Sequence, residues 1–366
     1  MQKVSVIGVG RLGLCFALTL EESGYDVVGC DVHQEYVDKI NNKSLRSSEQ
    51  GVEEYLQKSV NFLATTNIET TLNHSDALFA IVATPSLKSG RYDHSQVDNL
   101  IETLKGHGPQ EREKQLIVCC TTMPGYCDTV QERLKDYNYV VSYNPEFIAQ
   151  GTILRDQAEP DIILIGEGSK EAGDLIQKIY EDHATSEPRY CRMTRTEAEI
   201  CKISLNCFVT TKISFANMVG DIVIKAGGNP DIVLEAIGSD SRIGSRYLAH
   251  GYGYGGPCFP RDNRALAIYA SDIDMPADIS IATDMINEKH LGFQVSEFLS
   301  KNDIKDPVTF ETVTYKPGTT IIEESQQLAF AVEAACAGYD VTIVESLGTI
   351  SQVRDLYGNL FKYEEK

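Results

Sequence analysis

One cysteine, Cys258, lies in a glycine-rich run, GYGYGGPCFPRD at residues 251–262, directly before a predicted helix at 263–270. Glycine lets the backbone approach a ligand closely, and the N-terminus of a helix favours a thiolate over a thiol. An isolated cysteine is more often a small buried apolar residue, but four glycines and two prolines make a poor core strand. The run therefore predicts a reactive thiol in a ligand-facing loop.

A long helix is predicted from Thr196 to about residue 226, with Thr196 and Glu199 forming a capping box at its start. Lys202 and Asn206 are four residues apart and project from one side of this helix. A lysine on an amphipathic helix is usually a solvated charge, but Lys202 lies between two isoleucines. Both residues are candidates for a functional site.

The motif GxGxxG at residues 8–13 comes between a predicted strand at 4–7 and a predicted helix at 14–22. A second strand, 26–30, ends at Asp31, where an acidic side chain reaches a ribose hydroxyl. The glycines could instead serve helix packing alone, but that interpretation leaves Asp31 unexplained. No arginine follows Asp31 to receive a 2′-phosphate, so NAD is favoured over NADP.

Three further strands are predicted at 77–82, 115–120 and 139–142. Polar residues follow each of them: Thr84-Pro85, Thr121 to Gly125 with Thr122, and Tyr143 to Phe147 with Glu146. Taken singly, such residues are more often turn or cap residues than catalytic ones. Because ligands bind at the carboxyl ends of parallel strands, their shared position predicts a site at this edge of the sheet.

Size and charge limit the classes of protein. The chain has 366 residues, enough for two or three domains, and a net charge of −20 that argues against binding to nucleic acid or anionic membranes. We find no stretch long enough and apolar enough to span a bilayer and no signal peptide, so a cytoplasmic protein is expected. The ten cysteines show no metal-ligand spacing, which predicts reduced thiols and no metal site.

The rest of the chain predicts a helix starting at the Asn229 cap, a loop with Arg242, a helix at 277–300, and one βαβ unit after residue 308. The predicted fold class is α/β: an N-terminal Rossmann-like parallel sheet, a central helical domain with one long helix, and a short C-terminal α/β nucleotide-binding domain. The predicted domains are 1–193 (NAD binding), 194–300 (helical, dimerisation and catalysis) and 301–366 (UDP-sugar binding).

Together these motifs resemble the UDP-glucose/GDP-mannose dehydrogenase family over nearly the whole chain. The resemblance rests on the glycine motif with Asp31, Thr84-Pro85, Thr122, Asn144 to Phe147, Glu199/Lys202/Asn206, Asp240 to Gly244, the Cys258 loop, and Lys316 to Thr319. It implies NAD as cofactor, a UDP-sugar as substrate, and a four-electron oxidation of an alcohol to a carboxylate through a cysteine-bound intermediate. It also implies a homodimer formed through the central helical domain.

The resemblance also implies a role for each matching residue. The catalytic residues would be Cys258 as nucleophile, Lys202 and Asn206 at the oxyanion, Asp262 and Thr122 at the catalytic water, and Glu146 in thioester hydrolysis. The cofactor would contact Gly8, Gly10, Arg11, Leu12, Gly13, Asp31, Thr84, Pro85 and Thr122. The substrate would contact Phe147, Lys202, Asn206, Arg242, Tyr252, Gly255, Arg261 and Lys316, with Arg242 reaching from a neighbouring subunit.

Arg242-Ile243-Gly244 and the Gly-Tyr-Gly-Gly run are more like those of enzymes acting on UDP-glucose than those acting on GDP-mannose, so UDP-glucose is the expected substrate. Another nucleotide sugar, UDP-N-acetylmannosamine or GDP-mannose, is an alternative. Glu323 stands where the family has an arginine that meets the diphosphate, which favours a turnover-deficient sugar-nucleotide-binding relative as another alternative. A two-electron β-hydroxyacid dehydrogenase also has a helix lysine with an asparagine four residues on, but needs no thiol.

Overall fold

The computed structural model describes residues 2–47, 49–148 and 151–366. The chain divides into two compact units, Met1–Lys202 and Ile203–Lys366, and each is described separately. The division into three predicted domains remains a prediction.

The first unit is built on a mostly parallel sheet. Among the described residues it has eight strands in the order β3-β2-β1-β4-β5-β6-β7-β8. The strands are β1 (Lys3–Ile7), β2 (Asp26–Cys30), β3 (Phe62–Thr65), β4 (Ala77–Ala80), β5 (Lys114–Val118), β6 (Tyr139–Tyr143), β7 (Ile162–Glu167) and β8 (Arg189–Thr194). Only the β6–β7 pairing is antiparallel within this described sheet. The predicted Rossmann-like sheet is thus confirmed, with one strand reversal.

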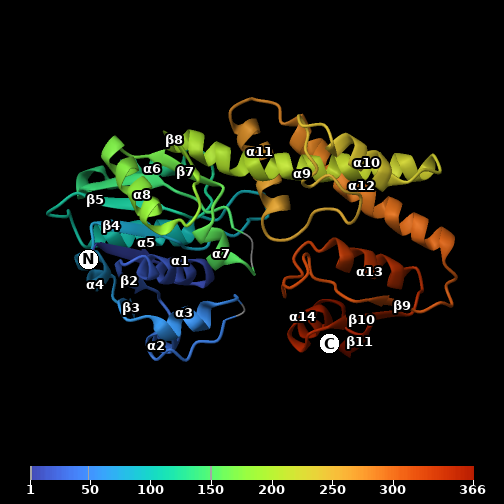
Figure 1. Cartoon of the computed structure of the whole chain (residues 1–366), viewed down its shortest axis with the longest axis horizontal. Coiled ribbons are helices and arrows are strands. Elements are labelled where there is room, and N and C mark those ends of the chain that lie inside the picture. Colours follow the sequence, from blue (N-terminus) through green and yellow to red (C-terminus); the bar gives the residue numbers. More distant parts are fainter. Residues whose placement is uncertain (1, 48, 149–150) are drawn as a thin grey trace. The chain divides into compact units, whose positions relative to one another are not determined.

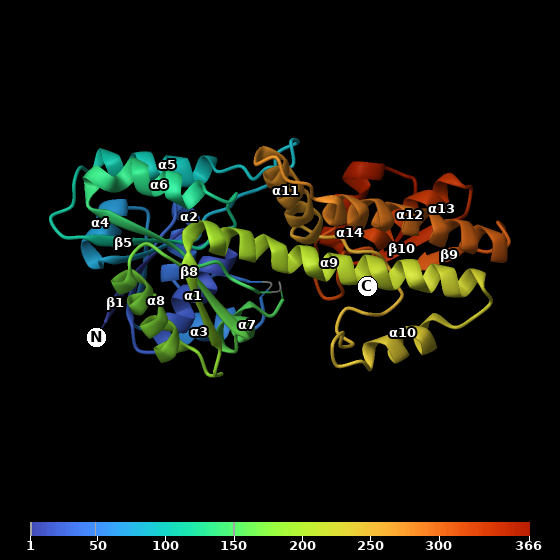
Figure 2. The same ribbon diagram turned by 90° about the horizontal axis from the view of Figure 1, so that it is seen from above.

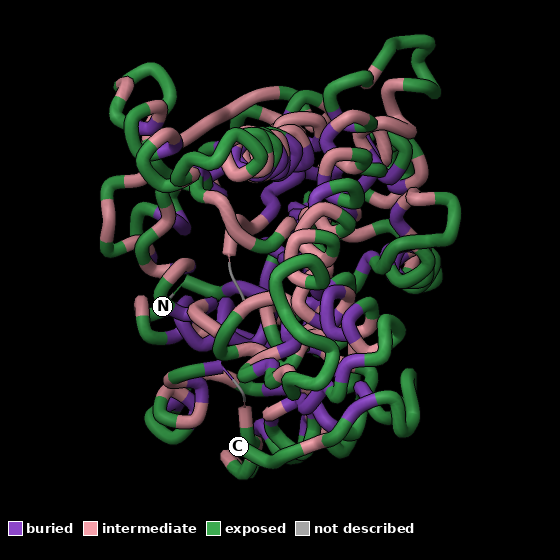
Figure 3. The backbone as a smooth tube through the Cα atoms, turned by 90° about the vertical axis from the view of Figure 1, so that its right-hand side faces the viewer, coloured by how far each residue is buried: buried purple, intermediate pink, exposed green. Residues whose placement is uncertain are grey.

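Helices cover both faces of this sheet (Figures 1 and 2). One apolar core lies beneath α1 (Arg11–Glu22), α2 (Gln34–Asn41), α3 (Val52–Lys58), α7 (Ile153–Ala158) and α8 (Lys170–His183). The other lies beneath α4 (Ile68–His74), α5 (Ser95–Gly106) and α6 (Tyr126–Leu134), which is followed by a 3₁₀ turn, η1 (Lys135–Tyr137). The strands of this sheet are largely buried, for example all of β4 and β5. Figure 3 marks buried stretches of the backbone in purple and exposed stretches, many of them in loops, in green. This arrangement leaves the loops at the strand ends available to ligands.

The second unit contains the remainder of α9 (Arg195–Lys225), which starts in the first unit, and α10 (Pro230–Gly238), α11 (Phe259–Asp272) and α12 (Asp278–Lys301). Asn229 caps α10 as predicted, because its side chain accepts from the Asp231 amide. The C-terminal part has β9 (Val308–Phe310), α13 (Gln326–Cys336), β10 (Val341–Glu345), α14 (Leu347–Tyr357) and β11 (Lys362–Glu365). Its described strands form a parallel sheet of three, so the prediction of a single βαβ unit was wrong by one strand and one helix.

Helix α9 corrects two predictions. The capping box is formed by Thr194 and Glu197, whose side chains bond each other's backbone amides, and not by Thr196 and Glu199. Among the described residues, α9 is also a helix that is long enough and apolar enough, by length and composition, to cross a bilayer, so the prediction that no such stretch exists was wrong. It nevertheless buries polar side chains, among them Thr210, Ser214 and Asn217. These buried hydrogen-bonding groups indicate a helix packed against protein.

Candidate active site

The glycine motif makes the tight turn between β1 and α1. Gly8 has φ of +90°, and a Cβ there would lie 2.3 Å from the Ile81 carbonyl oxygen. A Cβ on Gly13 would lie 1.9 Å from the Gly8 carbonyl oxygen, so helix and strand approach too closely for any other residue. Gly10 is the N-cap residue of α1 with open space at its Cβ position. The motif therefore presents a helix N-terminus that fits a dinucleotide diphosphate.

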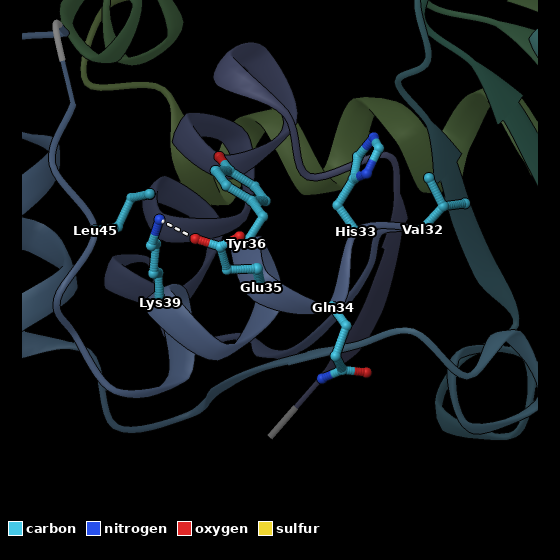
Figure 4. Close-up of a pocket in the computed structure, with 7 residues that line it drawn as sticks. All are labelled: Val32, His33, Gln34, Glu35, Tyr36, Lys39 and Leu45. Carbon is cyan, nitrogen blue, oxygen red and sulfur yellow. Dashed lines mark hydrogen bonds and ion pairs between the residues drawn. The ribbon is translucent and has the colours of Figure 1, made fainter.

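Beside this turn the chain forms two adjoining cavities at the end of β2. One, of about 350 Å³, is lined by Gly10, Arg11, Leu14, Asp31, Tyr36 and Val52, among others. The other, of about 530 Å³, is shown in Figure 4, where Tyr36 and Lys39 come from α2 and Leu45 from the loop after it. Polar Asp31 beside apolar walls fits a ribose and its adenine, which are the parts of NAD that follow the diphosphate.

Replacing Asp31 by alanine removes the carboxylate available to ribose hydroxyls. We expect the KM for NAD to rise about 10- to 100-fold with kcat little changed, since a hydrogen bond to a charged group contributes roughly 1.5–3 kcal/mol. Steady-state kinetics at a saturating concentration of the second substrate measures this. Asp38→Ala, which removes an exposed carboxylate from α2, is the matched control. Equal KM values for the two variants would contradict the role of Asp31.

The residues after β4 and β5 are held by buried hydrogen bonds. The Thr84 hydroxyl donates to the Thr121 carbonyl oxygen at 2.8 Å, and Pro85 after it is exposed. Thr122 is fully buried and donates its hydroxyl proton to Glu199 at 2.7 Å. Glu199 also accepts from the amides of Gly125 and Cys127, which shows why this acid is not at the helix cap. Its carboxylate fixes the loop after β5 against the start of α9.

Glu146 is a half-buried carboxyl group that accepts a hydrogen bond from Tyr180. Burial raises its pKa from the ordinary 4.5 to about 7, while the Tyr180 hydroxyl bond and the Lys202 charge act in the opposite direction. The Tyr180 hydroxyl lies 3.0 Å from Glu146 Oε1 and 2.9 Å from Asn144 Oδ1. Asn144 is oriented in turn because its amide donates to the Leu164 carbonyl oxygen. A carboxyl group that titrates near neutrality suits proton transfer.

Lys202 is 8% exposed, so the interpretation as a solvated surface charge does not hold. Its Nζ lies 4.5 Å from the centre of the Phe147 ring, a cation–π contact that orients the ammonium group. Phe147 follows Glu146 in the loop after β6. The first unit thereby brings together three of the predicted residues: Glu146, Phe147 and Lys202.

In the second unit Cys258 is exposed and is the N-cap residue of α11. The predicted helix after the cysteine is confirmed, and it starts at Phe259. All ten cysteines are described and are thiols, of which Cys258 and Cys336 are exposed. Cys258 thus stands at the N-terminus of a 14-residue helix, where the backbone amides carry a partial positive charge.

The glycines before Cys258 are required by close packing. A Cβ on Gly255 would lie 2.2 Å from the Glu324 carbonyl oxygen. Gly256 has φ of +81°, and a Cβ there would lie 2.3 Å from the Tyr315 ring. The Gly256 amide also donates to the Glu323 carbonyl oxygen at 3.0 Å. The loop therefore lies directly on the segment that precedes α13.

Asn206 and Asp262 form the polar centre of this unit. Asn206 Nδ2 donates to Asp262 Oδ2 at 2.6 Å, and the two side chains are almost fully buried. Arg261 Nε lies 3.4 Å from the other oxygen of Asp262. A hydrogen-bond donor, the Asn206 amide, and an acceptor, the Asp262 carboxylate, thus lie next to the cysteine loop.

Three predicted substrate residues lie elsewhere in the second unit. The Arg242 guanidinium is exposed and binds Asp240 in its own loop at 2.6 and 2.9 Å. Tyr252 is 42% exposed, and its ring packs edge-on against Phe330. Lys316 is half-buried, and its carbonyl oxygen accepts from the hydroxyls of Thr314 and Thr319. Arg242 does not join the Asn206–Asp262 pair.

Sequence reasoning missed Tyr180, His33, Tyr36 and the bonding role of Glu199. Tyr180 comes from α8, a helix with no motif, and contacts Glu146 only through the fold. His33 and Tyr36 follow Asp31 closely, so their position after the second strand was the available signal.

Comparisons with known proteins identify the family of the chain. Residues 2–184 match the NAD binding domain, and residues 196–289 the central domain, of the UDP-glucose/GDP-mannose dehydrogenase family. The chain is 30% identical over 341 residues to a UDP-glucose 6-dehydrogenase of Pseudomonas aeruginosa, covering 89% of this chain and 75% of that protein. It is 28% identical over 359 residues to a GDP-mannose 6-dehydrogenase of Pseudomonas savastanoi, covering 94% and 81%.

Among solved structures, a UDP-glucose dehydrogenase from the archaeon Pyrobaculum islandicum superposes with a TM-score of 0.89 at 28% identity, over 100% of this chain and 86% of that one. The chain belongs to the UDP-glucose/GDP-mannose dehydrogenase family, whose members are NAD-dependent nucleotide-sugar oxidoreductases.

Proposed function

We propose that the chain is a UDP-glucose 6-dehydrogenase that oxidises UDP-glucose to UDP-glucuronate with two molecules of NAD. The observation that carries the proposal is the exposed Cys258 at the N-terminus of α11, next to the buried Asn206–Asp262 pair. A dehydrogenase that stops at the aldehyde or ketone needs no such thiol.

The proposed reaction has four steps. The primary alcohol of the sugar gives a hydride to NAD and a proton to a base, which leaves an aldehyde. The Cys258 thiolate adds to the aldehyde carbon, and the oxygen takes a proton to give a thiohemiacetal. That carbon then loses its hydride to a second NAD while its hydroxyl gives up the proton to a base, which leaves a thioester. Water then displaces the thiolate and yields the carboxylate.

The polar residues serve these steps. Lys202 and Asn206 are four residues apart on α9 and supply an ammonium and an amide donor for the developing oxyanion. Asp262 holds the catalytic water and removes the first proton, with Thr122 assigned to the same water. Glu146 activates water for the hydrolysis of the thioester, which its pKa near 7 supports. Arg261, Phe147, Tyr252, Gly255, Lys316 and Arg242 are proposed to bind the substrate.

The pH dependence of hydrolysis tests the role of Glu146. As a base Glu146 must be ionised, so the rate should rise as the pH increases through about 7. The Tyr180 bond lowers this pKa, so in Tyr180→Phe the midpoint should move upward by up to about one unit, because a hydrogen bond of roughly 1 kcal/mol corresponds to slightly less than one unit. Pre-steady-state release of the acid measures the midpoint.

The matched control is Tyr139→Phe, which removes another buried hydroxyl of the first unit. A midpoint that is unchanged in Tyr180→Phe, or moved equally in Tyr139→Phe, would contradict the assignment.

The raised pKa of Glu146 also lowers the free energy of unfolding. Between pH 4.5 and about 7 the carboxyl group has lost its proton in the unfolded chain but keeps it in the folded chain. The stability of the fold therefore falls as the pH rises through this range.

Stoichiometry and substrate choice test the proposed function directly. Purified protein given limiting UDP-glucose and excess NAD should form two NADH per sugar. A parallel assay with UDP-N-acetylmannosamine and GDP-mannose tests the alternative substrates. One NADH per sugar would show a two-electron enzyme. Binding of sugar nucleotides by calorimetry without NADH would show the turnover-deficient relative that Glu323 suggests.

A homodimer through the helical domain is also proposed. Helix α9 exposes the apolar residues Phe208, Phe215 and Ile222, seven positions apart and therefore on one side of the helix. A second copy of the chain would cover this stripe. We expect Phe208→Glu to shift the protein from dimer to monomer in sedimentation experiments at micromolar concentration, whereas exposed Leu356→Glu on α14 should not. A monomeric unmodified protein would contradict the proposal.

A further inference from the structure

Two histidines and an aspartate of the second unit lie together outside the residues assigned to catalysis. Asp221 lies on α9 and His290 on α12, and His250 directly precedes the cysteine loop. His250 Nε2 lies 2.9 Å from Asp221 Oδ1, and His290 Nδ1 lies 2.8 Å from Asp221 Oδ2. Their potential ligand atoms all lie within 4.8 Å of one another.

The hydrogen bonds of His290 indicate a cation in this cluster. His290 Nε2 lies 2.6 Å from the Gly251 carbonyl oxygen, which can only accept, so Nε2 carries a hydrogen. A neutral imidazole has one N–H, so Nδ1 then presents a lone pair. That lone pair faces the Asp221 carboxylate at 2.8 and 3.0 Å, and two acceptors repel each other at this distance. A proton or a metal ion must lie between them.

We propose that Asp221, His250 and His290 bind a divalent transition-metal ion, for which Zn²⁺ is the best match. Two imidazole nitrogens and a carboxylate oxygen are a zinc ligand set that leaves a fourth position for water. Ligands at about 2.0–2.1 Å from a tetrahedral ion lie roughly 3.3 Å apart, so each imidazole nitrogen needs to move about 0.5 Å away from the Asp221 oxygens, and the two imidazole nitrogens lie within 4.8 Å of each other. The His290–Gly251 bond supplies the outer hydrogen bond that fixes the orientation of a ligating histidine.

The surroundings are shaped for this arrangement. A Cβ on Gly220 would lie 2.1 Å from the His250 ring, so the glycine leaves the space that the imidazole occupies. The side chain of His290 is 1% exposed, whereas those of His250 and Asp221 are 15% and 17% exposed, which leaves an entry for the ion. Gln294 also donates to the Gly251 carbonyl oxygen and holds that acceptor in place.

The proposed ion connects three segments of the second unit. It joins α9 and α12 to Gly251, the first residue of the loop that carries Cys258. The chemistry of the thiol itself requires no metal. The spacing rules applied to the sequence predict no metal site, because His250 and His290 are 29 and 69 positions from Asp221.

The test uses the full chain, stripped with a chelator and titrated with Zn²⁺. We expect each chain to bind one Zn²⁺ ion tightly and the bound ion to raise the thermal unfolding midpoint. In His290→Gln and in His250→Gln, both the tight binding of Zn²⁺ and the rise in the midpoint should be lost. Cys258→Ser should retain them, which excludes binding by the thiol, and His107→Gln in the first unit should also retain them.

Replacing Zn²⁺ by Co²⁺ in the unmodified protein should give the visible absorption spectrum of a tetrahedral Co²⁺ site. This measurement does not depend on whether any variant folds. Absence of a tight equivalent would overturn the proposal. So would binding that survives both histidine substitutions. A metal-insensitive protein in which nitrogen NMR finds both ring nitrogens of His290 protonated would also overturn it, because the cation would then be a proton.

Discussion

Substitution of Cys258 by serine is expected to lower the rate of acid formation from UDP-glucose by roughly 10³-fold or more, because a hydroxyl is a far weaker nucleophile than a thiolate at neutral pH. Without the covalent step the aldehyde carbon cannot become tetrahedral and give up a second hydride. The measurement is steady-state NADH formation together with chromatography of the sugar nucleotide products.

Cys336→Ser is the matched control, since Cys336 is the other exposed thiol and ends α13 away from the cysteine loop. It should retain full turnover. If Cys258→Ser keeps turnover with one NADH per sugar, the chain is a two-electron dehydrogenase and the covalent mechanism is wrong. Equal losses in the two variants would point to a nonspecific effect of thiol removal.

Replacing Lys202 by methionine is expected to lower kcat about 10²- to 10³-fold, which is the usual effect of removing one donor to an oxyanion. Methionine keeps the apolar stem against Phe147, so folding should be retained. KM should change little if the ammonium acts mainly in the transition state. Steady-state kinetics and thermal unfolding of the same samples separate the two effects.

Lys225→Met tests the loss of a positive charge from the same helix, because Lys225 lies on the exposed end of α9 and pairs with Glu297. It should leave kcat unchanged. A similar fall in kcat in both variants would show that the effect comes from a less stable helix and not from the position of Lys202. An unchanged kcat in Lys202→Met would show that Lys202 has no role in the reaction.

Local patterns in the sequence predicted most of the elements around the site. The strand ending at Asp31, the Asn229 cap and the helix after Cys258 depend on neighbours in the chain, and the structure contains all three. Glu199 was assigned to a cap because Thr196 precedes it by three residues. Its actual partners, the loop at 122–127, are about 70 positions away, and no local rule identifies them.

The same limit applies to electrostatics. The motif around Glu146 predicted a carboxyl group at a strand end, but its raised pKa depends on burial and on Tyr180 from α8. The Asp221–His250–His290 cluster likewise forms only when three separate segments pack together. Long-range packing decides these properties, and the identity of each residue alone does not.

The contact of Gly255 and Gly256 with Tyr315 and Glu324 has a consequence for biosynthesis. A ribosome makes Cys258 well before it makes these two partners, because translation runs from the N-terminus to the C-terminus. During that interval the loop that carries Cys258 lacks the residues against which it packs in the folded protein. We therefore expect this loop to reach its folded conformation only after the residues that begin α13 have been synthesised.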